Sequence, residues 1–131
     1  LKAEFAGRRV LIVEDEPINR ETAQMILEDA RLGVDLAANG IEALQRVVER
    51  RYDLILMDVQ MPKMDGLEAT RRIRRLPLHG GTPIIAMTAN VYEDDRQRCL
   101  DAGMNAHLAK PIDPQALERL LREWLGEPLP I

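Results

Sequence analysis

The sequence predicts an α/β fold with a five-stranded parallel sheet in the flavodoxin-like order 2-1-3-4-5 and helices on both faces. The first observation is a set of short apolar runs without polar alternation, which is typical of strands buried on both faces. The second is that a helical apolar pattern follows each run, so that strand and helix alternate five times. The third is the length of 131 residues, which suits one domain and makes the flavodoxin-like strand order the natural choice.

The first strand–helix unit begins with residues 8–13, whose apolar run from Val10 to Val13 predicts a buried strand. Pro17 suits the first position of a helix, because its missing N–H would have no helical partner there anyway. The helical pattern continues to about Ala30, and Gly33 is placed to end the helix. We expect its inward face to carry Ile18, Thr22, Met25 and Ile26.

The second unit is shorter. Residues 34–37 form the second strand, and the side chain of Asn39 caps the second helix. The apolar spacing indicates an inward face made of Ile41, Leu44, Val47 and Val48.

The third strand, residues 54–58, consists of four apolar residues and a terminal carboxylate, Asp58. The next helix starts near Gly66 and is capped by Asp65, so helix capping does not explain Asp58. Its inward face carries Leu67, Thr70, Ile73 and Leu76. The other face carries Arg71, Arg72, Arg74 and Arg75, which we interpret as a solvated helix face. A nucleic-acid surface is disfavoured, because no aromatic residues interleave with these arginines.

Residues 83–88 form the fourth strand. The fourth helix, 91–102, ends at Gly103 and has a thin apolar face, which suits a partner or a homodimer but also fits marginal stability. Residues 106–109 form the fifth strand, and Asp113 caps the fifth helix. That helix has a full apolar stripe of Leu117, Leu120, Leu121, Trp124 and Leu125.

Composition narrows the class of protein. Eighteen basic and 22 acidic residues give a net charge of −4, which offers no general case for a nucleic acid or a membrane as partner. A lone cysteine, Cys99, cannot form an internal disulfide, and no signal peptide is visible, so a cytoplasmic setting fits best. We expect residues 1–7 to be a linker or upstream remnant, 8–125 the domain and 126–131 a tail. The missing initial Met favours a domain cut from a longer protein.

Polar residues follow four of the predicted strands: Glu14 and Asp15 the first, Asp58 the third, Thr88 the fourth and Lys110 the fifth. Because the carboxyl ends of parallel strands meet at one edge of a sheet, we expect these side chains to gather. The carboxylates would raise one another's pKa unless a cation lay between them, and hard oxygen ligands suit Mg²⁺. Lys110 and Thr88 would complete a pocket for a phosphoryl group, and a carboxylate can itself be the nucleophile.

Residues 13–17, 57–66, 83–89 and 110–112 form four motifs that follow one another in order and in register. Together they resemble the receiver domain of two-component response regulators. The resemblance extends from about Arg8 to Leu125 and is closest to the receivers of hybrid sensor histidine kinases.

The resemblance implies that Asp58 accepts a phosphoryl group from a phosphohistidine on a histidine kinase or a histidine phosphotransfer domain. Asp15, Asp58 and the backbone carbonyl of Gln60 would hold Mg²⁺, or Mn²⁺ in its place. Glu14 would act through water or aid the placement of the ion.

The resemblance also assigns switching roles. Lys110 would pair with one phosphoryl oxygen, and Thr88 would move to hydrogen-bond another. The Lys110–Pro111 bond is cis in the family. Gln60 and Asn90 match positions that tune water attack on the phosphate. At the position of His107 the family commonly has Tyr or Phe, so two interpretations stay open: a pH-sensitive switch residue, or a half-buried strand histidine without a switching role.

We therefore expect a phosphorelay receiver whose phosphorylation switches the surface between the fourth strand and the fifth helix, where a homodimer could also form. It would be the C-terminal receiver of a hybrid kinase, and the parent kinase could be anchored in a membrane. The alternative is a free-standing response regulator that consists of this domain. Its only chemistry would be self-catalysed phosphorylation and dephosphorylation. One rival is a small-molecule phosphatase of the aspartyl-phosphate type, but such enzymes usually have a second Asp where Gln60 stands. Another rival is a degenerate receiver that binds a partner but is never phosphorylated. The sequence argues against it, because it retains all four site residues: Asp15, Asp58, Thr88 and Lys110.

Overall fold

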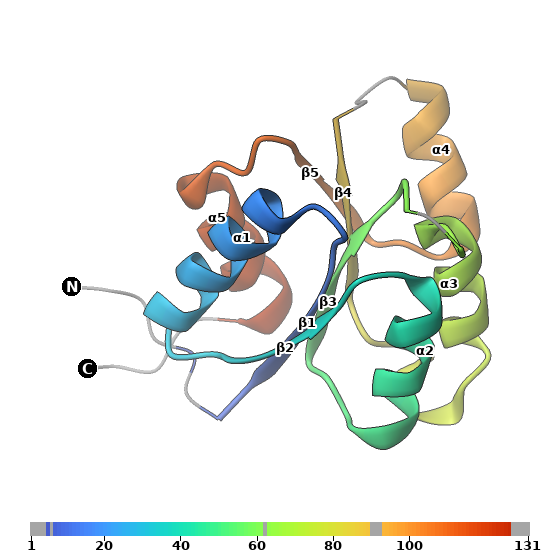
Figure 1. Cartoon of the computed structure of the whole chain (residues 1–131), viewed down its shortest axis with the longest axis horizontal. Coiled ribbons are helices and arrows are strands. Elements are labelled where there is room, and N and C mark those ends of the chain that lie inside the picture. Colours follow the sequence, from blue (N-terminus) through green and yellow to red (C-terminus); the bar gives the residue numbers. More distant parts are fainter. Residues whose placement is uncertain (1–4, 6, 62, 90–92, 127–131) are drawn as a thin grey trace.

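The computed structural model describes residues 5, 7–61, 63–89 and 93–126. Five parallel strands form one sheet in the order β2-β1-β3-β4-β5, as the sequence predicts (Figure 1). The strands are short. The central residues of β1, β3 and β4 are buried, whereas those of the two edge strands, β2 and β5, are mostly half-buried. Their bounds are β1 Arg9–Val13, β2 Gly33–Ala37, β3 Leu54–Asp58, β4 Ile84–Thr88 and β5 Ala106–Ala109.

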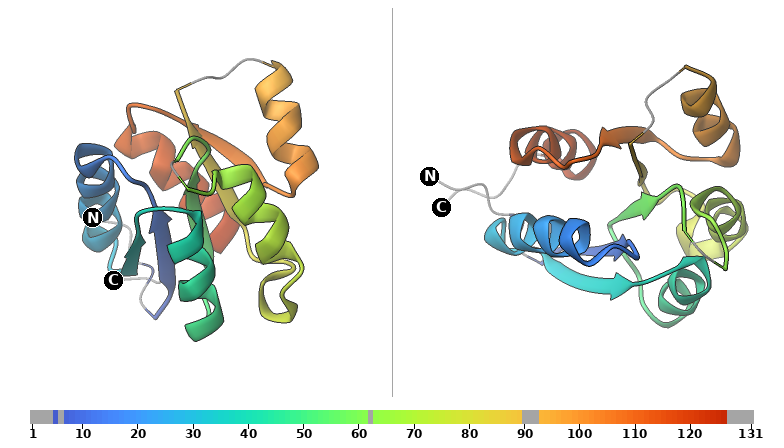
Figure 2. Two further views of the ribbon diagram at one scale, coloured as in Figure 1. Left: turned by 45° about the vertical axis from the view of Figure 1, so that its right-hand side comes forward. Right: turned by 45° about the horizontal axis from the view of Figure 1, so that its top comes forward.

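Helices cover both faces of the sheet. Helices α1 and α5 lie on one face, and α2, α3 and α4 lie on the other (Figure 2). Each face therefore has its own apolar core, and the sheet separates the two. The helices are α1 Pro17–Asp29, α2 Gly40–Glu49, α3 Gly66–Arg74, α4 Glu93–Ala102 and α5 Pro114–Leu125, with a short 3-10 helix at Pro77–His79. None of the helices in the described ranges is long and apolar enough to cross a bilayer.

The predicted caps are confirmed at three helices. The carboxamide of Asn39 accepts a hydrogen bond from the Glu42 N–H at 2.9 Å. The carboxylate of Asp65 accepts one from Glu68 N–H at 2.9 Å, and that of Asp113 accepts one from Gln115 N–H. Each side chain satisfies a helical N–H that has no partner inside its own helix.

The predicted inward face of α1 is correct only for Ile26, which packs against the core. Ile18 and Met25 are 71% and 67% exposed, and the buried residues of the helix are Ala23 and Leu27. Thr22 and Ile26 lie at the margin of the buried stripe. The periodic pattern fits two neighbouring stripes of this helix, and the smaller Ala side chain allows the close approach to the sheet.

The end of α1 also differs from the prediction. Arg31, not Gly33, takes the left-handed conformation, with φ 66°. The Leu32 N–H donates to the Leu27 carbonyl and the Arg31 N–H to the Glu28 carbonyl, which is the hydrogen-bond pattern of a Schellman motif. Gly33 is then the first residue of β2.

The inward face of α2 is only partly as predicted. Val47 is buried and Leu44 packs against the core, but Ile41 and Val48 are exposed. Gly40 and Ala43 take the inward positions instead. Small residues let the helix lie close to its neighbours, as in α1.

The solvated face predicted for α3 is correct for three arginines and wrong for Arg74. Arg71, Arg72 and Arg75 are exposed, and the first two pair with Glu68. The Arg74 guanidinium instead turns inward and donates to the carbonyls of His79, Gly80, Thr82 and Gly103 and to the side chain of Asn105. It thereby joins the segment after α3 to the turn before β5.

Phe5 lies before the predicted domain boundary at residue 8 and packs in the core on the α1 and α5 face. Its side chain is buried, and its N–H donates to the Ala30 carbonyl at 2.7 Å. Phe5 therefore adds buried apolar surface to this core, which stabilises the fold.

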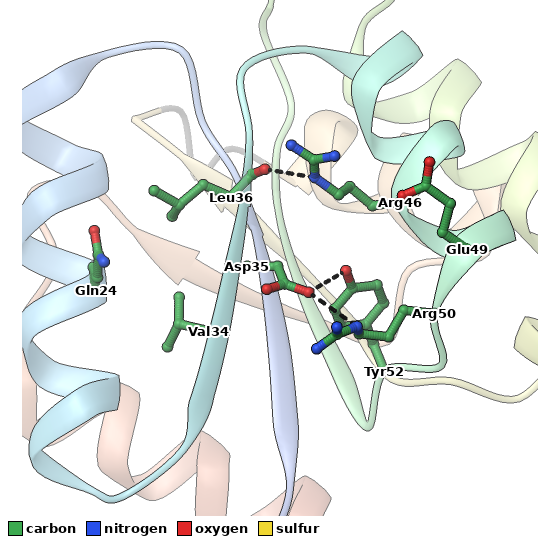
Figure 3. A pocket seen from close by; sticks show the side chains of 8 residues that line it. All are labelled: Gln24, Val34, Asp35, Leu36, Arg46, Glu49, Arg50 and Tyr52. Carbon is green, nitrogen blue, oxygen red and sulfur yellow. Dashed lines mark hydrogen bonds and ion pairs between the residues drawn. The ribbon is translucent and has the colours of Figure 1, made fainter.

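A pocket of about 490 Å³ lies at the edge strand β2 (Figure 3). Inside it the Asp35 carboxylate accepts a hydrogen bond from the Tyr52 hydroxyl at 2.7 Å and pairs with Arg50. The Nε of Arg46 donates to the backbone carbonyl of Leu36 at 3.1 Å. None of the predicted site residues lines this pocket.

Candidate functional site

Two carboxylates are brought together by strand register. Val13 of β1 pairs with Met57 of β3, so the next residues, Glu14 and Asp58, end neighbouring strands side by side. Glu14 is 0% and Asp58 4% exposed. Together with the exposed Asp15, they place one carboxylate oxygen each within 4.8 Å of the others. Three negative groups thus gather at the carboxyl edge of the sheet.

Lys110 neutralises part of this charge. Its Nζ lies 2.8 Å from Glu14 Oε1 and 3.1 Å from Asp58 Oδ1. The backbone fixes the base of the side chain, because the Lys110 N–H donates to the Thr88 carbonyl at 3.0 Å. The Lys110–Pro111 bond is cis. The ammonium therefore bridges two carboxylates that come from different strands.

Burial and charge set the protonation of these groups. Burial and then the carboxyl of Glu14 raise the pKa of Asp58 to about 7. Burial also acts to raise the pKa of Glu14, but hydrogen bonds with Asp58 and Lys110 outweigh it and lower this pKa. The pKa of Lys110 is raised, because its two carboxylate partners outweigh burial, which lowers it. Two buried carboxyls with one ammonium tend to keep one proton unless a further cation approaches.

The donor set fits a divalent cation. The Oε2 atom of Glu14 is buried and has no hydrogen-bond partner among the residues that the structure describes. Glu14, Asp15 and Asp58 offer hard, anionic oxygens at the spacing of a metal site. The Gln60 N–H donates to Asp58 Oδ1 at 3.2 Å, so the backbone of Gln60 lies at the same site. A small oxygen-preferring ion such as Mg²⁺ would neutralise the negative charge of the three carboxylates that the Lys110 ammonium does not balance.

Thr88 ends β4 beside β3, in which Asp58 pairs with Met87. It is nearly buried and lines a pocket of about 310 Å³ whose other lining residues include Gln60, Arg98 and Cys99. Thr88 therefore lines the same pocket as Val59, Gln60 and Met61 of the loop that follows Asp58.

His107 lies in β5 opposite Ala86 of β4 and is half-buried. Its Nε2 is buried and lacks a hydrogen-bond partner within the described ranges. Burial, followed by the charge of Arg96, lowers its pKa. Both interpretations of this residue remain open. Asn90 lies outside the described residues, so its predicted role stays a prediction.

One contact near the site was not foreseen from the sequence. The first residue of α2, Gly40, donates its N–H to the carbonyl of Met64, in the loop after β3. From the sequence, Asn39 and Asp65 are predicted only as helix caps. The glycines that follow them were the one available hint of close backbone approach.

Residues 10–122 match the response regulator receiver domain family. The histidine-protein kinase BarA of Escherichia coli K12 is 42% identical over 115 residues, which are 88% of this chain and 12% of that protein. The chain spans 15% or less of the first histidine kinases that it matches. A 14.6 kDa protein of Leptolyngbya boryana is 41% identical over 92% of each chain.

Solved structures agree. The receiver domain of the sensor histidine kinase PA1611 from Pseudomonas aeruginosa, with magnesium in its active-site cleft, has a TM-score of 0.86 and 44% identity, covering 93% of this chain and all of that one. The receiver domain of Ssk1 from Saccharomyces cerevisiae, in complex with the histidine phosphotransfer protein Ypd1, has a TM-score of 0.83 and 31% identity, covering 95% and 90% of the chains.

Proposed function

This chain belongs to the response regulator receiver domain family, and from that premise we propose that Asp58 is its phosphoacceptor in a phosphorelay. The observation that carries the proposal is the position of the Lys110 ammonium, which contacts Asp58 and Glu14 at a buried acidic edge. An acceptor carboxylate with a fixed cation beside it has the positioned charge that phosphoryl transfer requires.

We assign the metal site to Asp15, Asp58 and the backbone carbonyl of Gln60, with Glu14 aiding the placement of the ion. The structure of the PA1611 receiver with magnesium supports Mg²⁺ as the ion, and Mn²⁺ has the same ligand preference. When bound, the ion supplies positive charge to the phosphoryl oxygens.

The residues of the chain do the rest. An oxygen of Asp58 forms the new bond to phosphorus while the bond from phosphorus to the histidine nitrogen breaks, and the electron pair of that bond stays on the imidazole. Lys110 holds one phosphoryl oxygen, and the hydroxyl of Thr88 donates to another. That hydrogen bond shifts the equilibrium between two conformations of β4 to α5. Gln60 and Asn90 would set how fast water removes the phosphoryl group.

The proposed partner is a histidine kinase or a histidine phosphotransfer domain. The Ypd1–Ssk1 complex and the histidine kinases among the relatives support this. The exposed Ile18, in the first turn of α1 three residues after Asp15, offers an apolar contact to such a partner. We infer a receiver at 8–125, followed by a tail and preceded by a linker of which Phe5 packs in the core of the receiver. This receiver would form the C-terminal end of the cytoplasmic part of a hybrid kinase. A homodimer through α4, β5 and α5 is a further candidate contact.

Incubation with acetyl phosphate and Mg²⁺ tests the acceptor. Intact-protein mass spectrometry should show one added phosphoryl group on the natural chain and none on Asp58→Asn. The matched control is Asp65→Asn, which removes an exposed carboxylate of the same loop and should still be labelled. Labelling of Asp58→Asn would overturn the assignment, and rapid turnover of a phosphomonoester would favour the phosphatase instead.

A further inference from the structure

The N-terminus of α2 touches the loop that follows the acceptor strand. The Gly40 N–H donates to the Met64 carbonyl at 3.2 Å, which satisfies a first-turn N–H that has no partner in its own helix. A Cβ atom at Gly40 would lie 2.7 Å from the Met64 carbonyl oxygen and 2.9 Å from Met64 Cβ, closer than real Cβ atoms approach. Only glycine permits this contact, and any larger residue must push the two segments apart by several tenths of an ångström.

The described parts of this loop, 59–61 and 63–65, are held by several contacts. Its far end is fixed because the Gly66 N–H donates to the Val59 carbonyl at 3.0 Å, and a Cβ at Gly66 would collide with the carbonyl oxygen of Asp58. At its near end, the Gln60 N–H donates to Asp58 Oδ1. Lys63, next to Met64, already has a left-handed backbone with φ 68°. Movement of Met64 is therefore transmitted to Gln60 and to the acceptor carboxylate.

We propose that Gly40 is a positioning residue for the acceptor site: its close contact with Met64 holds the Val59–Asp65 loop so that the backbone of Gln60 and the carboxylate of Asp58 lie in place for the metal ion. The proposal rests on the proposed function. Gly40 itself touches neither the ion nor the phosphoryl group, and its influence passes through the loop.

The test compares Gly40→Ala with Gly81→Ala. A Cβ at Gly81 would meet nothing within 4 Å, and its backbone φ is ordinary, so this control adds the same methyl group in open space. Calorimetric titration should give an Mg²⁺ Kd about tenfold higher for Gly40→Ala, because the loss of groups that orient metal ligands typically lowers metal affinity by at least about this factor. At low Mg²⁺, acetyl phosphate should label Gly40→Ala more slowly than the natural chain, by about the same factor as the change in Kd. At saturating Mg²⁺ the two rates of labelling should be equal. A folded Gly40→Ala with natural affinity and rate overturns the proposal.

A second measurement needs no variant and so is independent of whether Gly40→Ala folds. In the natural chain, hydrogen exchange at the Gly40 N–H should slow at least about threefold on saturation with Mg²⁺, since the ion fixes the loop that accepts its hydrogen bond. Exchange at the Arg50 N–H, which donates to Arg46 at the other end of α2, should not change. Unchanged exchange at Gly40 overturns the positioning role. A natural chain that neither binds Mg²⁺ nor is labelled overturns the proposed function itself.

Discussion

The Nζ of Lys110 lies 3.1 Å from Oδ1 of Asp58, and the same nitrogen lies 2.8 Å from Oε1 of Glu14. One ammonium thus faces two buried carboxylates, with Asp15 close by. Charge at this edge is incompletely balanced within the described residues. The first two predictions follow from that imbalance.

Lys110→Met should destabilise the fold in the absence of Mg²⁺. The variant keeps the length of the side chain but leaves Glu14 and Asp58 buried without their cation, and the free energy of unfolding at about pH 8 should fall by roughly 2–4 kcal/mol. Urea unfolding measures it. Lys63→Met, an exposed lysine of the neighbouring loop, should change stability by less than about 0.5 kcal/mol. Equal stabilities of the two variants would contradict the bridging role.

Binding of Mg²⁺ should release a proton near neutral pH. Because the pKa of Asp58 is raised to about 7, this carboxyl is largely protonated at about pH 6 and must ionise to hold the ion. The affinity should rise with pH up to the pKa and then level off. Calorimetry in buffers of different ionisation enthalpy counts the protons, and the release should vanish at about pH 8.5. A release that is absent at about pH 6 would argue against the raised pKa.

Arg74→Ala should cost much more stability than Arg75→Ala. Arg74 donates to several backbone carbonyls around Thr82 and Gly103, and its loss would leave part-buried acceptors unpaired, so we expect about 2–4 kcal/mol. Arg75 is exposed, and its replacement should change stability by less than about 0.5 kcal/mol. Urea unfolding of both variants decides the matter, and similar losses would contradict the inward role of Arg74.

Arg31→Gly should be more stable than Arg31→Ala. Both variants lose the guanidinium, but only the second keeps a Cβ at φ 66°, where it opposes the backbone conformation. We expect a difference of about 1 kcal/mol in the free energy of unfolding, readable as a shift in thermal midpoint. If the alanine variant is as stable as the glycine variant, the left-handed end of α1 is not strained.

His107→Phe should gain stability relative to the natural chain as the pH falls. The pKa of His107 is lowered from 6.5, chiefly by burial, so the unfolded chain takes up a proton before the folded chain does. The natural chain therefore loses stability between about pH 7 and the lowered folded pKa, while phenylalanine does not titrate. Urea unfolding of both chains across this pH range gives the difference between their free energies of unfolding. The other titrating groups are the same in both chains, so their contributions cancel in this difference. A difference independent of pH would contradict the burial of the imidazole.

Strands and caps could be predicted because their signals are local. The run Leu54–Met57 is apolar on both faces, and Asn39 and Asp65 act on N–H groups three residues away. The gathering of Asp58 and Lys110 followed from parallel topology alone, since that topology aligns the strand ends.

Other features depend on contacts that no local pattern contains. In α1 the periodicity allowed a stripe through Ile18, whereas packing selected the one through Ala23. Arg74 turns inward because carbonyls of distant segments meet near the end of α3. The contact between Gly40 and Met64 requires the conformation of a loop that lies further along the chain, which the sequence does not specify by itself.

The hydrogen bond from Arg46 Nε to the Leu36 carbonyl, on the edge strand β2, has a consequence for aggregation. An exposed sheet margin is a template on which a foreign strand can add, and repeated addition leads to aggregates. Here a charged side chain already occupies an acceptor on that margin, so an intruding strand must first displace a guanidinium and leave it without its partner. The molecule thus shields its outermost strand with one of its own residues, which favours remaining dispersed at high concentration.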